Sequence, residues 1–289
     1  MVRVAYKITK PDGVIESGEE LISGEEIVKH FVIAGCGNVG GKKEFRKAKG
    51  ALIYFEDYFP DNENAKGFVA QTGYLYDPTA KAQFSNLVGK ALADYFFKRI
   101  VVNGITINYE AMMKIKLGSV KNVSRPDLYG ICNSSKVYAI EAKGFTNTTK
   151  KKQEHKNQAL NAPLHADYHI ASVTENIYTK IHVDFYDPSL EEIKIKCTEE
   201  DCTAVYYGQI IKDFLSDDNY ERVIKRHNNN YIILETFRFK GENIALAILE
   251  SIVDTISSGF LPKLDRLKSV INYEKMIDKI NILNKSYKE

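Results

Sequence analysis

The chain has 289 residues, of which 44% are hydrophobic and 27% are charged, with a formal net charge of +2. This length and apolar content can bury one large core or two modest ones. The near-balanced charge excludes a uniformly basic or acidic protein and leaves local patches open. No apolar run approaches the length of a membrane span, and the first residues do not resemble a signal peptide, so we expect a cytoplasmic protein without a membrane partner.

Residues 1–79 predict a β-rich N-terminal region. A turn is expected at residues 11–13, where proline, aspartate and glycine follow one another. Short apolar runs bounded by polar or glycine-rich stretches are typical of strands. The expected strands lie near residues 2–9, 30–35, 51–56 and 67–74.

Residues 35–40 contain the spacing G-x-G-x-x-G after an expected strand, and Glu56 stands downstream at the distance of a dinucleotide fingerprint. The intervening residues 42–49 are short and highly charged, whereas the helix of such a fold packs small and apolar side chains on its sheet. We therefore favour a glycine-rich turn between strands and expect no nicotinamide cofactor. A nicotinamide-dependent oxidoreductase is the least favoured function.

A helix is predicted around residues 84–95, because apolar side chains recur at the i, i+3, i+4 and i+7 spacing of one helical face. These side chains are Phe84, Leu87, Val88, Ala91, Leu92 and Tyr95. Residues 105–110 and 113–117 follow with partial alternation and predict two strands.

The most informative segment is a predicted hairpin, with one strand opening at Asp127 and the next closing with Glu141-Ala142-Lys143. The second strand is apolar on both faces, which indicates a central, covered strand. Glu141 and Lys143 share a face because they are two positions apart. A buried carboxylate without compensation costs several kcal/mol. A divalent cation held by Glu141 and Asp127 would compensate it, and the alternative is a structural Glu–Lys pair at the strand end.

The register of this hairpin decides whether the two acids meet. A symmetric turn over residues 133–136 would place Asp127 opposite Ala142 and separate it from Glu141. The acids converge only if the pairing is offset by one residue, through an odd-length loop or a bulge, or if Asp127 sits just outside the ladder. Pro126 favours the last arrangement, because proline cannot donate a hydrogen bond to a ladder.

Pro126-Asp127 and Glu141-Ala142-Lys143 resemble the motif of the PD-(D/E)XK, or restriction-endonuclease-like, nuclease superfamily. The resemblance covers residues 80–187 as a nuclease core. It implies an α/β (α+β) fold with a mixed central sheet flanked by helices, one before the first core strand and one after the Glu-x-Lys strand. It further implies that Asp127, Glu141 and the backbone carbonyl of Ala142 hold Mg²⁺ or Mn²⁺, ions that prefer oxygen ligands. Lys143 would then orient or help deprotonate the attacking water and offset charge on the phosphate.

Some members of this superfamily add an acid from the leading helix. Asp94 is the nearest match in this chain, and Glu110 at the end of an expected strand competes for the role. The alternative for Asp94 is an i, i+4 pair with Lys90 at the helix edge. Relatives also place a glutamine on the helix after the motif, for which Gln158 is the first candidate and Gln153 the second.

Residues 150–161 predict a polar helix that ends before Pro163. Lysines dominate its first half, and a basic face beside a carboxylate cluster suits a phosphate backbone. The alternative is an ordinary solvated helix face. The predicted DNA contacts are Lys150, Lys151, Lys152, His155 and Lys156.

Residues 188–289 predict a mostly helical region that packs on the core or mediates dimerisation. The expected elements are strands at 193–196 and 231–234 and helices at 204–215, 242–258 and 261–285. The four cysteines, at positions 36, 132, 197 and 202, form neither a disulfide scaffold nor a pattern typical of zinc. A reducing cytoplasm is the expected compartment.

The sequence thus predicts a Mg²⁺-dependent deoxyribonuclease that hydrolyses phosphodiester bonds, with a restriction or phage-defence endonuclease as the first assignment. A DNA repair or recombination nuclease and a catalytically silent nucleic-acid-binding relative are the alternatives. DNA is the expected partner, and cleavage of both strands by one site per chain would call for a homodimer.

Overall fold

The computed structural model describes residues 1–10, 12–35, 42–72, 77–101, 104–118, 123–132, 136–149, 152–187, 223–226, 229–250 and 281–284. All structural statements below concern these residues.

A seven-stranded mixed sheet forms the centre of the molecule, in the order β2-β1-β7-β6-β5-β4-β3. The pairs β1–β7 and β5–β6 are parallel, and the other neighbours are antiparallel. The expected α/β class with a mixed central sheet and helices is therefore confirmed. The strands are β1 (Val2–Thr9), β2 (Ile15–Ile22), β3 (Ile105–Asn108), β4 (Leu128–Ile131), β5 (Val137–Gly144), β6 (Tyr168–Glu175) and β7 (His182–Tyr186).

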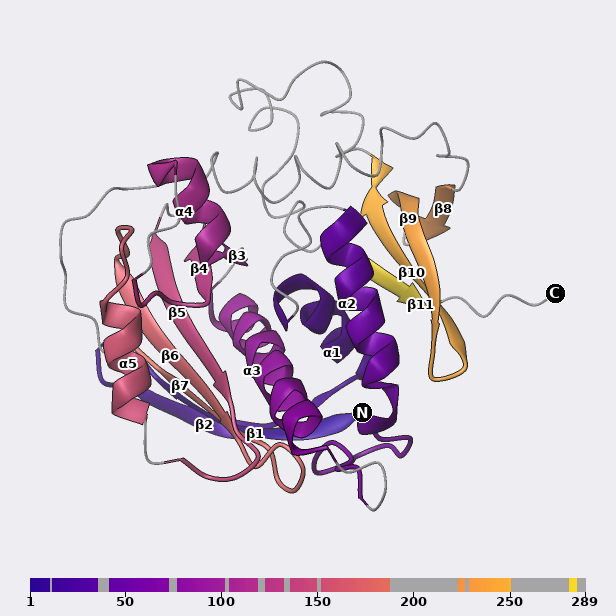
Figure 1. The fold of residues 1–289 in the computed structure, drawn as a ribbon, viewed down its shortest axis with the longest axis horizontal. Coiled ribbons are helices and arrows are strands. Elements are labelled where there is room, and N and C mark those ends of the chain that lie inside the picture. The colour runs from indigo at the N-terminus through magenta and orange to yellow at the C-terminus, as the bar shows by residue number, and fades with distance from the viewer. Residues whose placement is uncertain are drawn as a thin grey trace.

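Helix α3 (Pro78–Ile100) crosses the sheet and packs on β5, β6 and β7 (Figure 1). Asp77 caps it by accepting a hydrogen bond from the Thr79 N–H, and Pro78 occupies the first turn, where a missing N–H costs nothing. The helix predicted around residues 84–95 is confirmed. Phe84 on this helix is the centre of an aromatic cluster with Phe31, Phe55, Tyr58, Phe59, Phe68 and Tyr178.

Two shorter helices complete the layer around the sheet. Helix α5 (Lys152–Leu160) packs on β5 and β6, and α4 (Tyr109–Leu117) packs on β3 and β4. The strand predicted at residues 113–117 is wrong, because these residues lie in α4. Asn108 begins this helix by accepting a hydrogen bond from the Ala111 N–H, and Gly118 ends it with a positive φ of 69°. In the described part of the chain, no helix is both long and apolar enough to cross a membrane.

The N-terminal region contains fewer strands than predicted. The strand expected at 2–9 is β1, but residues 30–35 lie in α1 (Gly24–His30) and the π-helical turn η1 (Phe31–Gly35). Residues 51–54 lie in α2 (Lys42–Tyr54), and a short 3₁₀ turn, η2 (Glu56–Tyr58), follows. Residues 67–72 form no strand, and residues 73 and 74 lie outside the described residues. The predicted N-terminal region, residues 1–79, contributes β1 and β2 to the same sheet as the predicted nuclease core, residues 80–187. The two regions therefore share one sheet.

Local chemistry explains the helices at these positions. Short apolar runs do not distinguish a buried helix from a strand. The decisive signal is the N-cap of α1, where the Ser23 side chain accepts a hydrogen bond from the Glu26 N–H three residues later. Since helical residues precede Gly35, the glycine-rich spacing does not follow a strand, as a dinucleotide fingerprint requires.

The described C-terminal residues form a four-stranded antiparallel sheet, β11-β10-β9-β8. Its strands are β8 (Val223–Arg226), β9 (Asn229–Phe239), β10 (Glu242–Leu249) and β11 (Asn281–Asn284). The strand expected at 231–234 is part of β9. The helices expected at 242–258 and 261–285 are wrong over residues 242–249 and 281–284, which are strands. The remaining elements expected at 193–196 and 204–215 lie outside the described residues.

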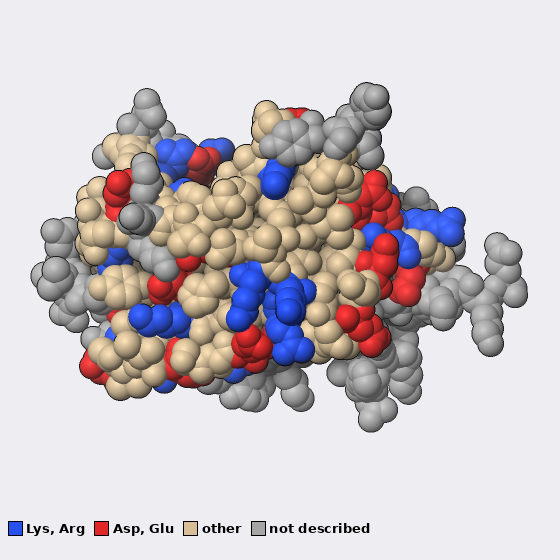
Figure 2. All heavy atoms as spheres, turned by 90° about the horizontal axis from the view of Figure 1, so that it is seen from below, with Lys and Arg blue, Asp and Glu red and all other residues tan. Residues whose placement is uncertain are grey.

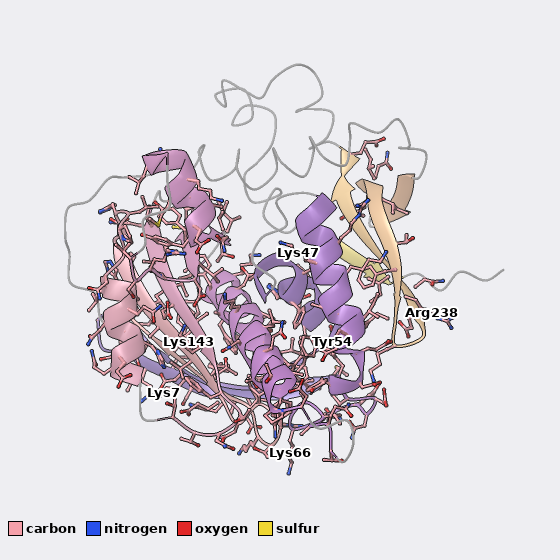
Figure 3. The ribbon with its side chains drawn as sticks, in the orientation of Figure 1. Lys7, Lys47, Tyr54, Lys66, Lys143 and Arg238 are labelled. Atoms are coloured by element: carbon pink, nitrogen blue, oxygen red, sulfur yellow. The ribbon has the colours of Figure 1, made fainter. Side chains whose placement is uncertain are left out.

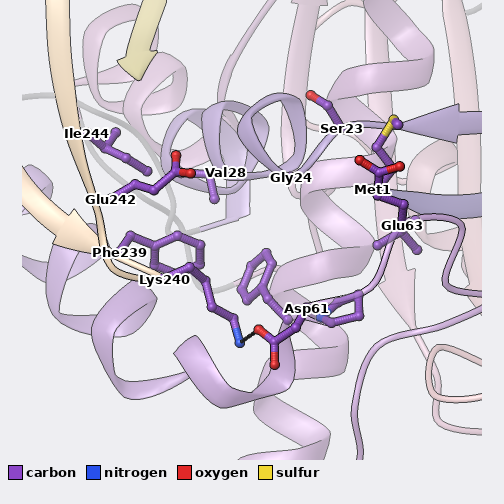
Figure 4. Close-up of a pocket in the computed structure, with 13 residues that line it drawn as sticks. Met1, Ser23, Gly24, Val28, Asp61, Glu63, Phe239, Lys240, Glu242 and Ile244 are labelled. Atoms are coloured by element: carbon purple, nitrogen blue, oxygen red, sulfur yellow. Dashed lines mark hydrogen bonds and ion pairs between the residues drawn. The ribbon is translucent and has the colours of Figure 1, made fainter. Parts of the chain in front are cut away.

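A two-residue turn explains why β10 is a strand. Lys240 and Gly241 both have positive φ angles, 51° and 76°, as required in the tightest hairpin connections. A cavity of about 510 Å³ lies between this hairpin and the N-terminal region (Figure 4). The Lys240 ammonium reaches across to Asp61 at 2.7 Å, and its backbone N–H donates to the Glu56 carboxylate. These contacts hold the second sheet against the N-terminal region.

Candidate active site

The register of the β4–β5 hairpin brings Asp127 and Glu141 together. Leu128 pairs with Ile140 and Ile131 with Val137, which is offset by one residue from the symmetric pairing, and the ladder ends at Leu128. Asp127 lies just outside β4, and its N–H donates to the Ile140 carbonyl. The Lys143 ammonium lies 2.5 Å from Glu141 and 3.8 Å from Asp127, so the two carboxylates converge on it. The hairpin therefore places the two acids side by side, as the sequence interpretation required.

Backbone hydrogen bonds fix the position of Asp127. Its N–H donates to the Ile140 carbonyl at 3.1 Å, and its own carbonyl accepts from the Tyr109 N–H at 3.1 Å. Its carboxylate oxygen Oδ2 accepts a hydrogen bond from the Ala142 N–H at 3.1 Å. Because β4 has ended at this point, the side chain of Asp127 takes the place of the missing ladder partner. The orientation of the carboxylate is thus set by the neighbouring strand.

Two lysines lie beside this pair of acids. The Lys143 Nζ lies 2.5 Å from Glu141 Oε1 and 3.8 Å from Asp127 Oδ2. Lys90 on α3 contributes a second ammonium, 2.8 Å from Asp127 Oδ1. Figure 3 labels Lys143 in the space between α5 and α3. The site therefore contains two carboxylates and two ammonium groups that converge from β4, β5 and α3.

Glu141 is the anomalous member of the set. Its side chain is 0% exposed, and neither of its carboxylate oxygens accepts a hydrogen bond within the described residues. The Lys143 ammonium approaches Oε1 closely as an ion pair, without the geometry of a hydrogen bond. Burial and the neighbouring Asp127 raise the pKa of Glu141 to about 8, although Lys143 opposes the shift. Without a further cation, this carboxyl group holds a proton at neutral pH.

Lys143 shows the opposite balance. Burial alone would lower the pKa of its ammonium group, but Asp127 and Glu141 together outweigh burial and raise that pKa. Lys143 therefore stays positively charged at neutral pH. A charged ammonium group can stabilise an anionic substrate but cannot accept a proton.

Two glycines allow α3 to approach the end of β5. A Cβ atom on Gly89 would lie 2.6 Å from the Gly144 nitrogen, and one on Gly144 would overlap the Ser85 carbonyl oxygen. Helix and strand thus meet backbone to backbone at this point. The contact brings Lys90, the residue after Gly89, within reach of Asp127.

The oxygen atoms at this site fit a hard divalent cation. Glu141 offers two buried oxygens that lack hydrogen-bond donors, and Asp127 lies beside it. The N–H and C=O groups of a strand residue point to the same side, so the Ala142 carbonyl points towards Asp127, past the end of β4. Mg²⁺ and Mn²⁺ bind through one or two carboxylates together with carbonyl or water oxygens. Among the described residues no group of three or more His, Cys, Asp or Glu is arranged to hold a metal ion, and the predicted set needs only two carboxylates.

The accessory candidates have different surroundings. Gln158 on α5 donates a hydrogen bond to the Arg125 carbonyl at 3.2 Å, so it supports the turn that leads into Pro126 and Asp127. Glu110 lies in the first turn of α4, not at a strand end, and its half-exposed carboxylate pairs with the Arg125 side chain. Both residues therefore bind Arg125, two positions before Asp127: Gln158 contacts its backbone carbonyl and Glu110 contacts its side chain.

Asp94 belongs to a separate buried cluster. Its carboxylate contacts His30 Nδ1 at 2.6 Å, Lys98 Nζ at 3.0 Å and the Thr106 hydroxyl at 2.5 Å. The i, i+4 pair expected with Lys90 is wrong, because Asp94 pairs with Lys98 and Lys90 pairs with Asp127. Burial alone would raise the pKa of Asp94, but Lys98 and His30 lower it well below its usual value. Asp94 therefore belongs to a different cluster of side chains from Asp127 and Glu141, and its partners join α3 to α1 and β3.

The predicted DNA-binding helix requires a correction at Lys156. Its side chain is 2% exposed, its ammonium donates to the His169 carbonyl, and Asp187 lies 3.8 Å away. Burial lowers the pKa of Lys156 to about 8, so this lysine supports the interior and does not face a phosphate backbone. The His155 ring packs on Phe145. Lys150, Lys151 and the side chain of Lys152 lie outside the described residues.

Sequence reasoning missed the roles of Lys90, Gly89 and Gly144. Gly89 was the available signal, because a glycine inside a predicted helix often marks a close packing contact. No family model, curated protein or solved structure matches this chain.

Proposed function

We propose that this chain is a metal-dependent nuclease of the PD-(D/E)XK type that hydrolyses phosphodiester bonds in DNA. The observation that carries the proposal is the buried, unsatisfied carboxylate of Glu141, placed beside Asp127 and in contact with Lys143. The order of α3, then β3, β4 and β5, then α5 and β6 agrees with the helix–strand–helix order that the sequence resemblance implies.

The oxygen ligands at the site suit a metal-dependent hydrolysis. In this proposal Asp127, Glu141 and the Ala142 carbonyl hold Mg²⁺ or Mn²⁺, which supplies a Lewis acid and lowers the pKa of a bound water. The Ala142 N–H keeps the Asp127 carboxylate in the orientation that this role requires. The reaction is displacement at phosphorus, in which a water oxygen forms a bond to phosphorus while one ester P–O bond breaks.

Lys143 has a role that follows from its raised pKa. Because its ammonium group stays protonated at neutral pH, it stabilises negative charge on the phosphate instead of acting as a general base. Lys90 pairs with Asp127 and supplies a second positive charge at the same place. Both lysines therefore favour an anionic substrate over a neutral one.

Cleavage assays test the proposal. Purified wild type, Lys143→Ala and a control, Lys47→Ala, are incubated with plasmid and linear duplex DNA in Mg²⁺ or EDTA. Lys47 is exposed on α2 and lies away from the site (Figure 3). We expect wild type and Lys47→Ala to cut only with metal, and Lys143→Ala to be slower by on the order of 10³-fold. Cutting in EDTA, or an unchanged rate for Lys143→Ala, would contradict the proposal.

A further inference from the structure

The candidate active site lies at one edge of the central sheet. The parallel strands β5 and β6 both end at this edge, and β5 carries Glu141 and Lys143 close to its end. Since β6–β7 is antiparallel and β7–β1 is parallel, β7 and β1 both begin at the same edge. Lys143 lies in one row of the sheet with Lys7, three strand spacings or about 14 Å away. Arg3 lies four residues, or about 13 Å, further along β1, so it is about 20 Å from Lys143.

A continuous packed surface connects these two points. The Tyr178 ring lies in the segment between β6 and β7, and its hydroxyl is 3.4 Å from the Ser85 hydroxyl. Ser85 is the residue whose carbonyl meets Gly144 at the end of β5. On the other side of the same segment, a Cβ atom on Gly67 would lie 2.8 Å from the Thr179 nitrogen. Residues 64–67 are therefore packed against the segment that borders the candidate active site.

A basic cavity opens at the far end of this edge. It has a volume of about 350 Å³, and its charged lining consists of Arg3, Lys66, Lys180 and Glu19. We call these four residues the basic notch. Glu19 pairs with Arg3 at 3.3 Å and with Lys180 at 3.8 Å, so the notch has one carboxylate for three cations and Glu19 pairs with two of them. The notch keeps an excess of positive charge.

The charged side chains of the notch face solvent. The side chains of Lys180 and Arg3 are 71% and 45% exposed. Figure 3 labels Lys66 at the lower edge of the molecule. Figure 2 views the molecule from that side and shows Lys and Arg atoms gathered near the middle of the face, with acidic atoms beside them. A long anion can approach this face without moving the fold.

We propose that the basic notch binds backbone phosphates of the nucleic acid strand whose scissile bond lies at Glu141 and Lys143. The inference rests on the proposed function, because it assumes a nucleic acid in the site. A separation of about 20 Å corresponds to about six nucleotides at 3.4 Å per nucleotide along one strand. Lysine and arginine contacts to phosphates position a strand without reading its bases, so the notch binds in a sequence-independent manner.

Binding measurements without cleavage test the notch. A fluorescein-labelled 20-nucleotide DNA duplex is titrated with protein in EDTA, and anisotropy reports the Kd. The double variant Lys66→Glu/Lys180→Glu is compared with a charge-matched control, Lys47→Glu/Arg238→Glu, whose residues are exposed away from the edge (Figure 3). We expect the notch variant to bind more weakly by on the order of tenfold or more, and the salt dependence of log Kd to fall by about 1.8 for two lost phosphate contacts. The control should bind within about twofold of wild type.

A second variant, Glu19→Gln, should change DNA affinity in the opposite direction. Glu19→Gln removes the acid from the notch, so it should tighten binding by several-fold while leaving the fold intact, because Glu19 is exposed. Equal effects of the notch and control variants, unchanged binding by Glu19→Gln, or no binding of DNA by wild type would each overturn the inference. The proposed function has a different test, since it fails when wild type with Mg²⁺ leaves DNA uncut, even if the notch binds DNA in EDTA.

Discussion

Asp94 and Glu141 are both 0% exposed, yet their pKa values are shifted in opposite directions. Asp94 on α3 contacts a histidine, a lysine and a hydroxyl group, and its pKa is lowered. Glu141 on β5 has one ion pair and no hydrogen-bond donor, and its pKa is raised to about 8. Burial alone therefore does not distinguish a structural acid from a functional one.

The two carboxylates differ in how many hydrogen-bond partners they have within the described residues. Asp94 joins α3 to His30 at the end of α1 and to Thr106 in β3, so it contributes to the fold without any further ligand. His30 in turn lies 3.1 Å from the Glu26 carboxylate, and its hydrogen bond lowers the pKa of Glu26 to about 2. Glu141 costs stability until a cation reaches it. Unmet coordination is the feature that distinguishes Glu141 from Asp94.

The largest expected effect is on cleavage by Glu141→Gln. The amide keeps the shape of the side chain but cannot carry the negative charge that holds a cation. We expect cleavage with Mg²⁺ to fall by on the order of 10³-fold, and we expect the variant to unfold at higher urea than wild type. The proposed difference between Glu141 and Asp94 is wrong if Glu141→Gln cuts DNA at the wild-type rate, or if the variant unfolds at clearly lower urea than wild type.

Asp94→Asn should have the converse effect. Removing one partner of a buried, hydrogen-bonded charge cluster costs about 3–5 kcal/mol, because Lys98 and His30 are left without their counter-charge. Urea unfolding at neutral pH measures this loss. If Asp94→Asn and Glu141→Gln change the unfolding free energy in the same direction and by similar amounts, the distinction between the two acids is wrong.

Stability in EDTA should depend on pH in a way that separates the two acids. The pKa of Glu141 is about 8 in the folded chain against an ordinary 4.5, so the native state holds a proton that the unfolded chain releases in this interval. Wild type should therefore lose stability between about pH 4.5 and pH 8, by on the order of a few kcal/mol. Asp94 has a lowered pKa, so its contribution is constant above its ordinary value of 3.8 and disappears only as the pH falls below it.

Glu141→Gln is the control for this pH dependence. Urea unfolding of the variant should show a smaller decline than wild type over the same interval, because the titrating group is absent. A decline of identical size in both proteins would assign the effect to another group.

The smallest expected effect concerns the lysine partners of each aspartate. Lys90→Met removes the ammonium that lies 2.8 Å from Asp127, so Mn²⁺ should bind more tightly by on the order of tenfold in a calorimetric titration. Lys98→Met removes the equivalent partner of Asp94 and should lower stability without changing Mn²⁺ affinity. Weaker Mn²⁺ binding by Lys90→Met, or the same change in both variants, would show that the lysine at the site does not compete with a cation.

The convergence of the candidate site was predictable because strand geometry has a period of two. Glu141 and Lys143 had to share a face, and the possible registers of the hairpin were few enough to enumerate from Pro126 and the turn. The choice among those registers was not predictable, since it depends on how the whole sheet packs. Lys90 was beyond prediction for the same reason, because only the approach of Gly89 to Gly144 brings α3 near Asp127.

Other errors arose where local patterns are ambiguous. The lysines that precede Gln158 look alike in the sequence, yet Lys156 is buried, because a long aliphatic stem can carry its ammonium to an internal carbonyl. Residues 30–35 and 242–249 are short apolar runs that suit either a helix or a strand. A cap before the first, at Ser23, and a tight turn before the second, at Lys240 and Gly241, decided the outcome.

The parallel pairing of β1 with β7 has a consequence for how the chain folds. Residues 5–9 find their partners at residues 182–186, so the middle of the large sheet stays open during synthesis until β7 has left the ribosome. Pairings that are so distant in sequence form late and slow the folding reaction. We therefore expect the β1–β2 hairpin to join the sheet last, and the edge of β6 to stay unpaired in the nascent chain until β7 has been synthesised.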